Sequence, residues 1–223
     1  MAEVYYYVPT EDSDYIVECG LKLSRWFERE ILFEGINKKC FSALLNPKDD
    51  MIKFNNESLR CMKLDLPSEY CYVADKYLYE VGLNMSEIME SYYKSIIPLE
   101  KYIFGLYRLP ECLITTTVIP GQVDILNKAQ DTPVLFNSSE ELYINNLIEI
   151  NKEIYEDFDD IVLYYFYSKL AGYKNITKIE EKNKGIAIFI DTTNIEGEKI
   201  HTIKMPKTVI EIENNNGDLK SEI

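Results

Sequence analysis

Histidine is almost absent from this chain of 223 residues, which contains His201 and no other. A multi-histidine metal site is therefore excluded, and a serine–histidine–aspartate triad would have to use this one residue. His201 alternates with Ile200 and Ile203, a pattern that places it on the surface of a strand. The sequence thus predicts no metal site and no histidine-based catalysis.

Glycine-rich phosphate motifs are missing as well. The chain contains neither G-x-x-x-x-G-K-[ST] nor G-x-G-x-x-G, which excludes the P-loop and the common dinucleotide-binding fingerprint. Asp49 and Asp50 follow Pro47 closely, and we interpret them as acids in the first turn of a helix, where they favour the helix dipole, rather than as metal ligands.

The five cysteines are odd in number and form no C-x-x-C pair. In a chain of this length, that pattern favours reduced, mostly buried thiols over a disulfide framework or a zinc site. The cysteines are Cys19, Cys40, Cys61, Cys71 and Cys112.

Long apolar runs are also lacking, since none approaches the roughly 18–20 residues that span a bilayer. Residues 1–7 show no basic segment followed by an apolar stretch, which a secretory signal requires. We therefore expect a cytoplasmic protein with no membrane partner.

Acidic side chains are abundant, and the formal net charge is −14. Residues 1–63 hold nine basic against eleven acidic side chains, whereas residues 64–223 hold 15 against 27. The acidic part would repel a phosphate backbone, so we expect weak or no nucleic-acid binding. The first part is nearly neutral and could hold a small anion such as a nucleotide.

Local patterns indicate a mixed α+β fold. Residues 4–8 are rich in tyrosine and valine, which favours a strand. Ser138 and Glu141 form a capping box that opens a helical stretch to about residue 170, with a possible break near residues 159–160. Residues 22–38 are interpreted as loop and short helix. The other expected strands are 40–45, 59–66, 71–73, 112–118 and 123–126, the other helices are 11–19 and 84–96, and a hairpin joins 185–190 to 200–205.

The segment Tyr5–Leu21 carries a family resemblance. It reads Y-Y-Y-V-P-T-E-D, followed by a short helix with an isoleucine and then G-L. This resembles the opening of the ADP-ribosyltransferase-like superfamily, in the branch with RNA 2′-phosphotransferases and DarT-type enzymes. The residues in register are Pro9, Glu11, Ile16, Gly20 and Leu21; Tyr6 stands where the family has histidine.

A second segment, Arg108–Ile114 followed by Ile119-Pro120, is similar to the family's late strand. The resemblance covers about residues 4–127 and implies that Glu111 is the catalytic glutamate. Such a carboxylate can stabilise the positive charge that develops when the bond between ribose and nicotinamide breaks. The alternative is an ordinary strand-edge residue. A cleft carboxylate is expected to contribute little to stability.

The resemblance also implies a nucleotide site. Tyr6 would face NAD and donate a hydrogen bond, although it cannot act as a near-neutral acid or base. Arg25 or Arg29 would hold the pyrophosphate, since arginine suits bidentate phosphate contacts, and Ser42 is a weaker candidate for the cleft. The alternatives are packing for Tyr6, a solvated surface for the arginines and a structural role for Ser42.

The implied fold is a pair of small packed β-sheets with flanking helices, plus a C-terminal helix and β-hairpin extension. The expected organisation is a domain over residues 1–130, an extension packed on it over 131–213, and a frayed tail over 214–223. We expect an NAD-using ADP-ribosyltransferase-like protein with a protein or small-molecule acceptor. The alternatives are a non-catalytic module that binds NAD, ADP-ribose or a partner, and an RNA 2′-phosphotransferase-like enzyme, which the negative charge disfavours. The sequence leaves the oligomeric state open.

Overall fold

The computed structural model describes residues 1–126, 138–172, 175–192 and 197–207. The chain divides into two compact units, Met1–Leu147 and Ile148–Ile223. The boundary expected at residue 130 and the tail expected over 214–223 lie outside the described residues.

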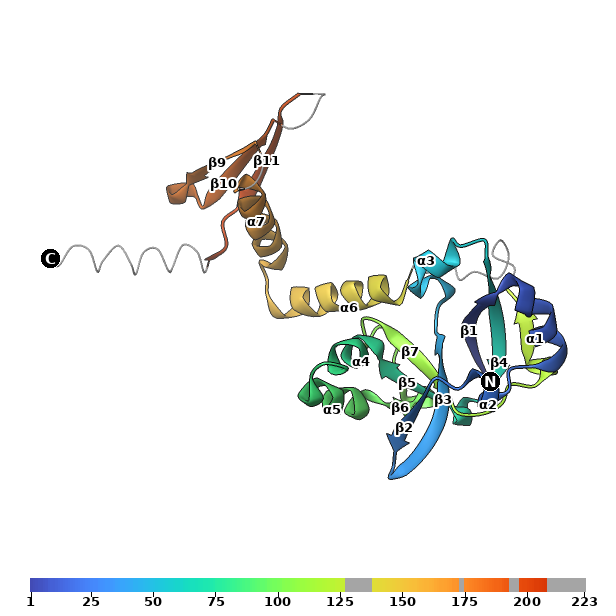
Figure 1. The fold of residues 1–223 in the computed structure, drawn as a ribbon. Coiled ribbons are helices and arrows are strands. Elements are labelled where there is room, and N and C mark those ends of the chain that lie inside the picture. The colour runs from blue at the N-terminus through green and yellow to red at the C-terminus, as the bar shows by residue number, and fades with distance from the viewer. Residues whose placement is uncertain (127–137, 173–174, 193–196, 208–223) are drawn as a thin grey trace. The chain divides into compact units, whose positions relative to one another are not determined.

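The first unit is built on one eight-stranded antiparallel sheet (Figure 1). Seven strands follow the order β6-β5-β7-β3-β1-β4-β8, and β2 pairs with β3 outside that path. The strands are β1 (Ala2–Pro9), β2 (Arg29–Phe33), β3 (Ile36–Leu44), β4 (Leu59–Leu66), β5 (Cys71–Asp75), β6 (Ile97–Pro98), β7 (Pro110–Ile114) and β8 (Val123–Ile125).

This architecture confirms the mixed α+β class. The strands are hydrogen-bonded into a single sheet rather than into the two small sheets that the resemblance implied. The expected strand over 59–66 coincides with β4. The expectation of loop and short helix over 22–38 is confirmed by α2 (Leu23–Trp26) and wrong from Arg29 onward, where β2 and the start of β3 form a hairpin. Charged residues on this largely exposed hairpin hide its alternation, so its strand pattern is weak in the sequence.

The sheet is narrowest where β1 meets β3. The register between these strands consists of one pair, Tyr5 opposite Leu44, whereas β1 pairs with β4 over its whole length. β3 pairs in turn with β7 along Phe41–Leu44. The two halves of the sheet therefore meet at one point, and side chains from both strands border that junction.

Apolar side chains pack on both faces of the sheet. Phe41, Cys112 and Ile114 belong to the larger core, which also takes Ile16 from α1 (Ser13–Cys19). Leu113 belongs to a second cluster with Tyr92 from α5 (Ser86–Ser95). Residues alternate between faces along a strand, so the face of β7 that carries Leu113 and Glu111 lies beneath α5. The short helices α2 (Leu23–Trp26), α3 (Met51–Phe54) and α4 (Lys76–Gly82) complete the unit.

Two glycines permit close approaches in this unit. Gly20 ends α1 with a φ of 73°, and a Cβ there would lie 2.1 Å from the carbonyl oxygen of Val118. Gly82 ends α4, where a Cβ would lie 2.9 Å from the backbone of Met89 in α5. Only glycine therefore fits both positions without a shift of backbone.

The second unit is smaller. α7 (Phe158–Ala171) packs on a three-stranded sheet of β9 (Ile176–Glu181), β10 (Ile186–Asp191) and β11 (Lys199–Lys204). α6 (Ser139–Ile154) spans the boundary between the two units and precedes α7. The long helical stretch expected from residue 138 to about 170 is thus interrupted between Ile154 and Phe158, slightly before the possible break near residues 159–160. The expected hairpin is confirmed as β10 and β11, and β9 is an additional strand. His201 lies on β11, half-buried against Tyr167.

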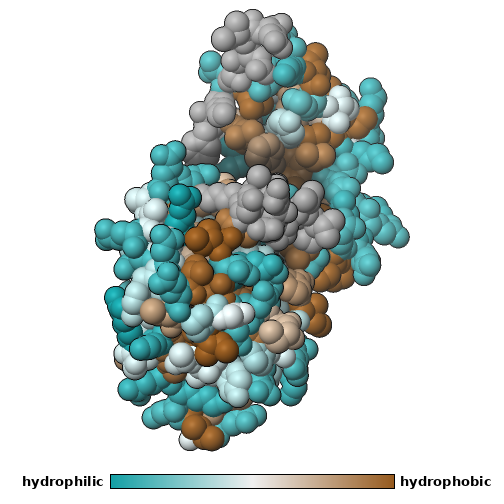
Figure 2. Space-filling model, turned by 90° about the vertical axis from the view of Figure 1, so that its right-hand side faces the viewer, coloured by the Kyte–Doolittle hydropathy of each residue, from teal (hydrophilic) through white to brown (hydrophobic). Residues whose placement is uncertain are grey.

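The surface of the molecule mixes hydrophilic and apolar residues. The face seen in Figure 2 is mainly hydrophilic, with apolar residues in separate patches. Four of the cysteines are buried thiols, as expected, while Cys19 is exposed. None of the helices within the described ranges combines the length and the apolar character needed to cross a bilayer.

Candidate functional site

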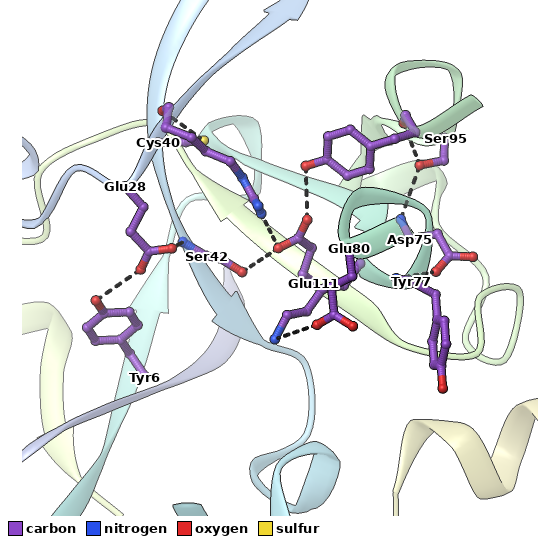
Figure 3. A network of polar contacts seen from close by, with 12 residues as sticks. Tyr6, Glu28, Cys40, Ser42, Asp75, Tyr77, Glu80, Ser95 and Glu111 are labelled. Carbon is purple, nitrogen blue, oxygen red and sulfur yellow. Dashed lines mark hydrogen bonds and ion pairs between the residues drawn. The ribbon is translucent and has the colours of Figure 1, made fainter. Parts of the chain in front are cut away.

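A cavity of about 330 Å³ opens at the junction between β1 and β3. Its walls come from β1, β2, β3, β7, α3 and α4, and most of its polar side chains are bonded to one another (Figure 3). The lining residues are Tyr5, Tyr6, Tyr7, Glu28, Arg29, Ser42, Leu44, Lys53, Lys76, Tyr79, Glu80 and Glu111.

Glu111 occupies the centre of this network. It lies on β7 between Leu44 of β3 and Ala74 of β5, and its residue exposure is 0%. Ser42 Oγ donates to Glu111 Oε2 over 2.5 Å, and Tyr92 OH donates to Oε1 over 2.9 Å. Arg29 forms an ion pair with Oε2. A carboxylate offers about four lone-pair positions, so these three donors use most of its hydrogen-bonding capacity.

Arg29 is the first residue of β2 and is fixed on two sides. Its guanidinium pairs with Glu111, and its Cζ lies 3.9 Å from the centroid of the Tyr79 ring. Burial works to lower the pKa of Arg29, but the charge of Glu111, the nearby Tyr92 and hydrogen bonds to Tyr79 and Glu111 together outweigh burial and raise that pKa above its ordinary value. Arg29 Nε is buried without a hydrogen-bond partner among the described residues. Arg29 therefore remains a cation held against Glu111.

Glu28 connects Tyr6 with Ser42 through hydrogen bonds to both residues. Tyr6 OH donates to Glu28 Oε1 over 3.2 Å, and the backbone N–H of Ser42 donates to Glu28 Oε2 over 3.2 Å. Burial, together with the charge of Glu28, raises the pKa of Tyr6 well above its ordinary value. Tyr6 therefore stays a neutral donor at physiological pH. Ser42 touches both carboxylates, Glu28 through its nitrogen and Glu111 through its hydroxyl.

Tyrosines of β1 border the cavity from both faces of the strand. Tyr5 and Tyr7 pack with Leu44, whereas Tyr6 packs on Phe41 with ring centroids 5.2 Å apart. Tyr6 thus points to the opposite face of β1 from Tyr5 and Tyr7, as expected for a strand. All three nevertheless line the cavity, because β1 is separated from β3 beyond the Tyr5–Leu44 pair.

The structure brings together four of the five side chains that the resemblance singled out: Tyr6, Arg29, Ser42 and Glu111. Arg25 is not among the lining residues, and its guanidinium lies over the rings of Tyr15 and Trp26. Glu111 is not a rim residue, because its strand is central in the sheet. Arg29 is placed to neutralise Glu111 rather than to hold a pyrophosphate.

Sequence reasoning missed Glu28, Tyr92, Lys53 and Lys76. Glu28 lies in a charged stretch interpreted as loop, and no local pattern distinguishes it from its acidic neighbours. Tyr92 reaches Glu111 from a helix whose tyrosines look like ordinary packing residues. Only the tertiary fold shows that these side chains share one cavity.

Metal and thiol chemistry receive no support here. Within the described ranges, no three histidine, cysteine, aspartate or glutamate side chains gather in a group that could hold a metal ion. Burial raises the pKa of Cys40, beside Arg29, to about 12, so this thiol is not a nucleophile at neutral pH.

Comparison with protein-family models, with curated proteins and with solved structures found no match to this chain.

Proposed function

We propose that this protein binds NAD through the cavity at the β1–β3 junction and transfers its ADP-ribose to a protein or small-molecule acceptor. One observation carries the proposal: Tyr6, Arg29, Ser42 and Glu111, far apart in the sequence, line one cavity. In the resemblance to ADP-ribosyltransferases, Glu111 matches the catalytic glutamate and Tyr6 stands at the position of the family's histidine. A chance resemblance would have no reason to place these two on the same cavity.

Glu111 supplies the electrostatic part of the proposed reaction. The bond between ribose C1′ and the pyridinium nitrogen breaks with its electron pair going to nitrogen, so nicotinamide leaves neutral. An acceptor oxygen or nitrogen then bonds to C1′ and releases its proton to solvent. A buried carboxylate beside C1′ stabilises the positive charge that develops between these events. Ser42 and Tyr92 hold that carboxylate in place.

The size and polarity of the cavity suit part of NAD. A volume of about 330 Å³ is at the lower end of the range of about 300–1,000 Å³ for small-molecule sites. It accommodates about half of NAD, the nicotinamide and its ribose with the adjoining phosphate, rather than the whole dinucleotide. Tyr6, through its ring, can stack on or border the nicotinamide.

A non-catalytic binding module is the second candidate, and a specific contact favours it. The charge of Glu111 is partly neutralised by Arg29, which lowers its power to stabilise a cation. Tyr6 is bonded to Glu28 and cannot move protons near neutral pH. Both features suit a protein that holds ADP-ribose without turnover.

Release of nicotinamide from NAD distinguishes the two candidates. We expect the parent protein to release nicotinamide and Glu111→Gln to do so about 10²–10³-fold more slowly, because one electrostatic stabiliser is removed. The affinity for NAD should change little, since the charge develops only in the transition state. Glu30→Gln, an exposed acid on β2, is the matched control and should release nicotinamide at the parent rate.

ADP-ribose binding without nicotinamide release from the parent would establish the binding module instead. Absence of both would refute the proposed function in either form.

A further inference from the structure

Two lysines border the cavity besides Arg29. Lys53 comes from α3, which follows β3 after the turn Pro47–Asp49. Glu28, which is bonded to the backbone of Ser42, lines the same cavity.

Lys76, the first residue of α4, adds a second cation to the cavity wall. Glu80 stands one helical turn further along and lies with Glu111 and Ser42 in the same close view (Figure 3). Arg29 is occupied by Glu111. Among the described lining residues, the two lysines are thus the cations that do not contact Glu111.

Both lysines have carboxylate neighbours that a stronger anion can replace. Lys53 Nζ lies 3.3 Å from Asp50 Oδ2. Lys76 Nζ lies 3.8 Å from Glu80 Oε1, and this second distance is too long for a hydrogen bond. Their side chains are 49% and 31% exposed. Ion pairs of this kind are worth about 0–1 kcal/mol, so they do not hold the ammonium groups away from a phosphate.

We propose that Lys53 and Lys76 bind a phosphate or pyrophosphate group, so that the ligand lies with its phosphates toward α3 and α4. The rest of the ligand then shares the cavity with Glu28 and Glu111. NAD contains such a pyrophosphate, between its two nucleosides. The identity of the ligand as NAD rests on the proposed function, whereas the anion site rests on the lysines alone.

The test is calorimetric titration of the parent protein and of Lys53→Met, Lys76→Met and the double variant. The ligands are ADP-ribose, ADP and inorganic pyrophosphate, with nicotinamide as the ligand that lacks phosphate. Methionine keeps the apolar stem and removes the charge. Lys101→Met is the matched control, because Lys101 is exposed and does not line the cavity.

We expect each single substitution to lower the affinity for ADP-ribose, ADP and pyrophosphate on the order of tenfold, as for the loss of one charged contact. The affinity for nicotinamide should not change, and Lys101→Met should match the parent. Unchanged binding of ADP and pyrophosphate in the double variant, or no binding of them to the parent, would overturn the anion site.

The two proposals fail in different ways. If the parent releases nicotinamide from NAD while the double variant binds ADP-ribose like the parent, the anion site is wrong and the proposed function stands. If binding of pyrophosphate depends on the lysines but NAD and ADP-ribose do not bind, the anion site stands and the proposed function is wrong.

Discussion

Glu111 receives contacts from three separate elements of the first unit: Arg29 from β2, Ser42 from β3 and Tyr92 from α5. Its side chain is fully buried and that of Arg29 is 13% exposed. The pair is therefore shielded from water, and losing either partner leaves a buried charge uncompensated. We therefore expect Glu111 to contribute to stability, in contrast to the expectation from the sequence.

Glu111→Gln should accordingly lower the free energy of unfolding. Removing one partner of a buried ion pair typically costs about 3–5 kcal/mol, and we expect about 3 kcal/mol because the Tyr79 ring still covers the Arg29 guanidinium. Urea unfolding followed by circular dichroism measures the change. Glu30→Gln should stay within about 0.5 kcal/mol of the parent. Equal stability of Glu111→Gln and the parent would contradict the buried pair.

α4 positions one wall of the cavity, and its packing on α5 positions α4. Lys76, Tyr79 and Glu80 lie on the face of α4 that borders the cavity, as expected for residues three and four apart. The absence of a side chain at Gly82 lets α4 approach the backbone of Met89. The sequence did not predict α4 as a helix, because it is short and follows β5 directly.

Gly82→Ala should destabilise the protein although alanine is the better helix former. The added Cβ would lie 2.9 Å from the Cα and nitrogen of Met89, and backbone cannot yield as a side-chain end can. We expect a loss of about 1–3 kcal/mol, as for other overpacked sites, measured by urea unfolding. Gly121→Ala is the control, since nothing lies within 4 Å of its Cβ position. A more stable Gly82→Ala variant would show that the helices do not pack this closely.

At the scale of the whole molecule, local sequence patterns predicted more of the fold than of the site. The extent of β4 and the pairing of β10 with β11 follow from alternation. The contact between Asp49 and the start of α6 could not be predicted from alternation or from any other local pattern. The Asp49 carboxylate accepts hydrogen bonds from Ser139 N over 2.6 Å and from Ser139 Oγ over 2.8 Å, and the two residues are 90 positions apart in the chain. Glu28 and Lys76 likewise reach the cavity through tertiary packing, which no local pattern encodes.

Tyrosine makes the whole molecule sensitive to alkaline pH. The chain has 18 tyrosines, and burial raises the pKa of Tyr6, Tyr7 and Tyr92, and raises that of Tyr102 to about 12. These phenols hold their protons more tightly in the folded state than in the unfolded state. Stability should therefore fall as pH rises above about 10, where unfolded tyrosine ionises.

A spectrophotometric titration of tyrosinate checks this expectation. We expect some of the tyrosines to ionise near pH 10 and the rest to ionise only as the protein unfolds. Near-ultraviolet circular dichroism, recorded over the same pH range, measures the unfolding. Ionisation of all tyrosines near pH 10 with an unchanged folded spectrum would contradict the burial of these phenols.

The central claim is that the cavity around Ser42 and Glu111 is an NAD site. Calorimetric titration of the folded parent protein with ADP-ribose tests it most directly, because binding requires no turnover and no acceptor. We predict saturable binding at one site per chain, with competition by NAD. No heat of binding up to millimolar ADP-ribose, from protein shown to be folded, would contradict the claim.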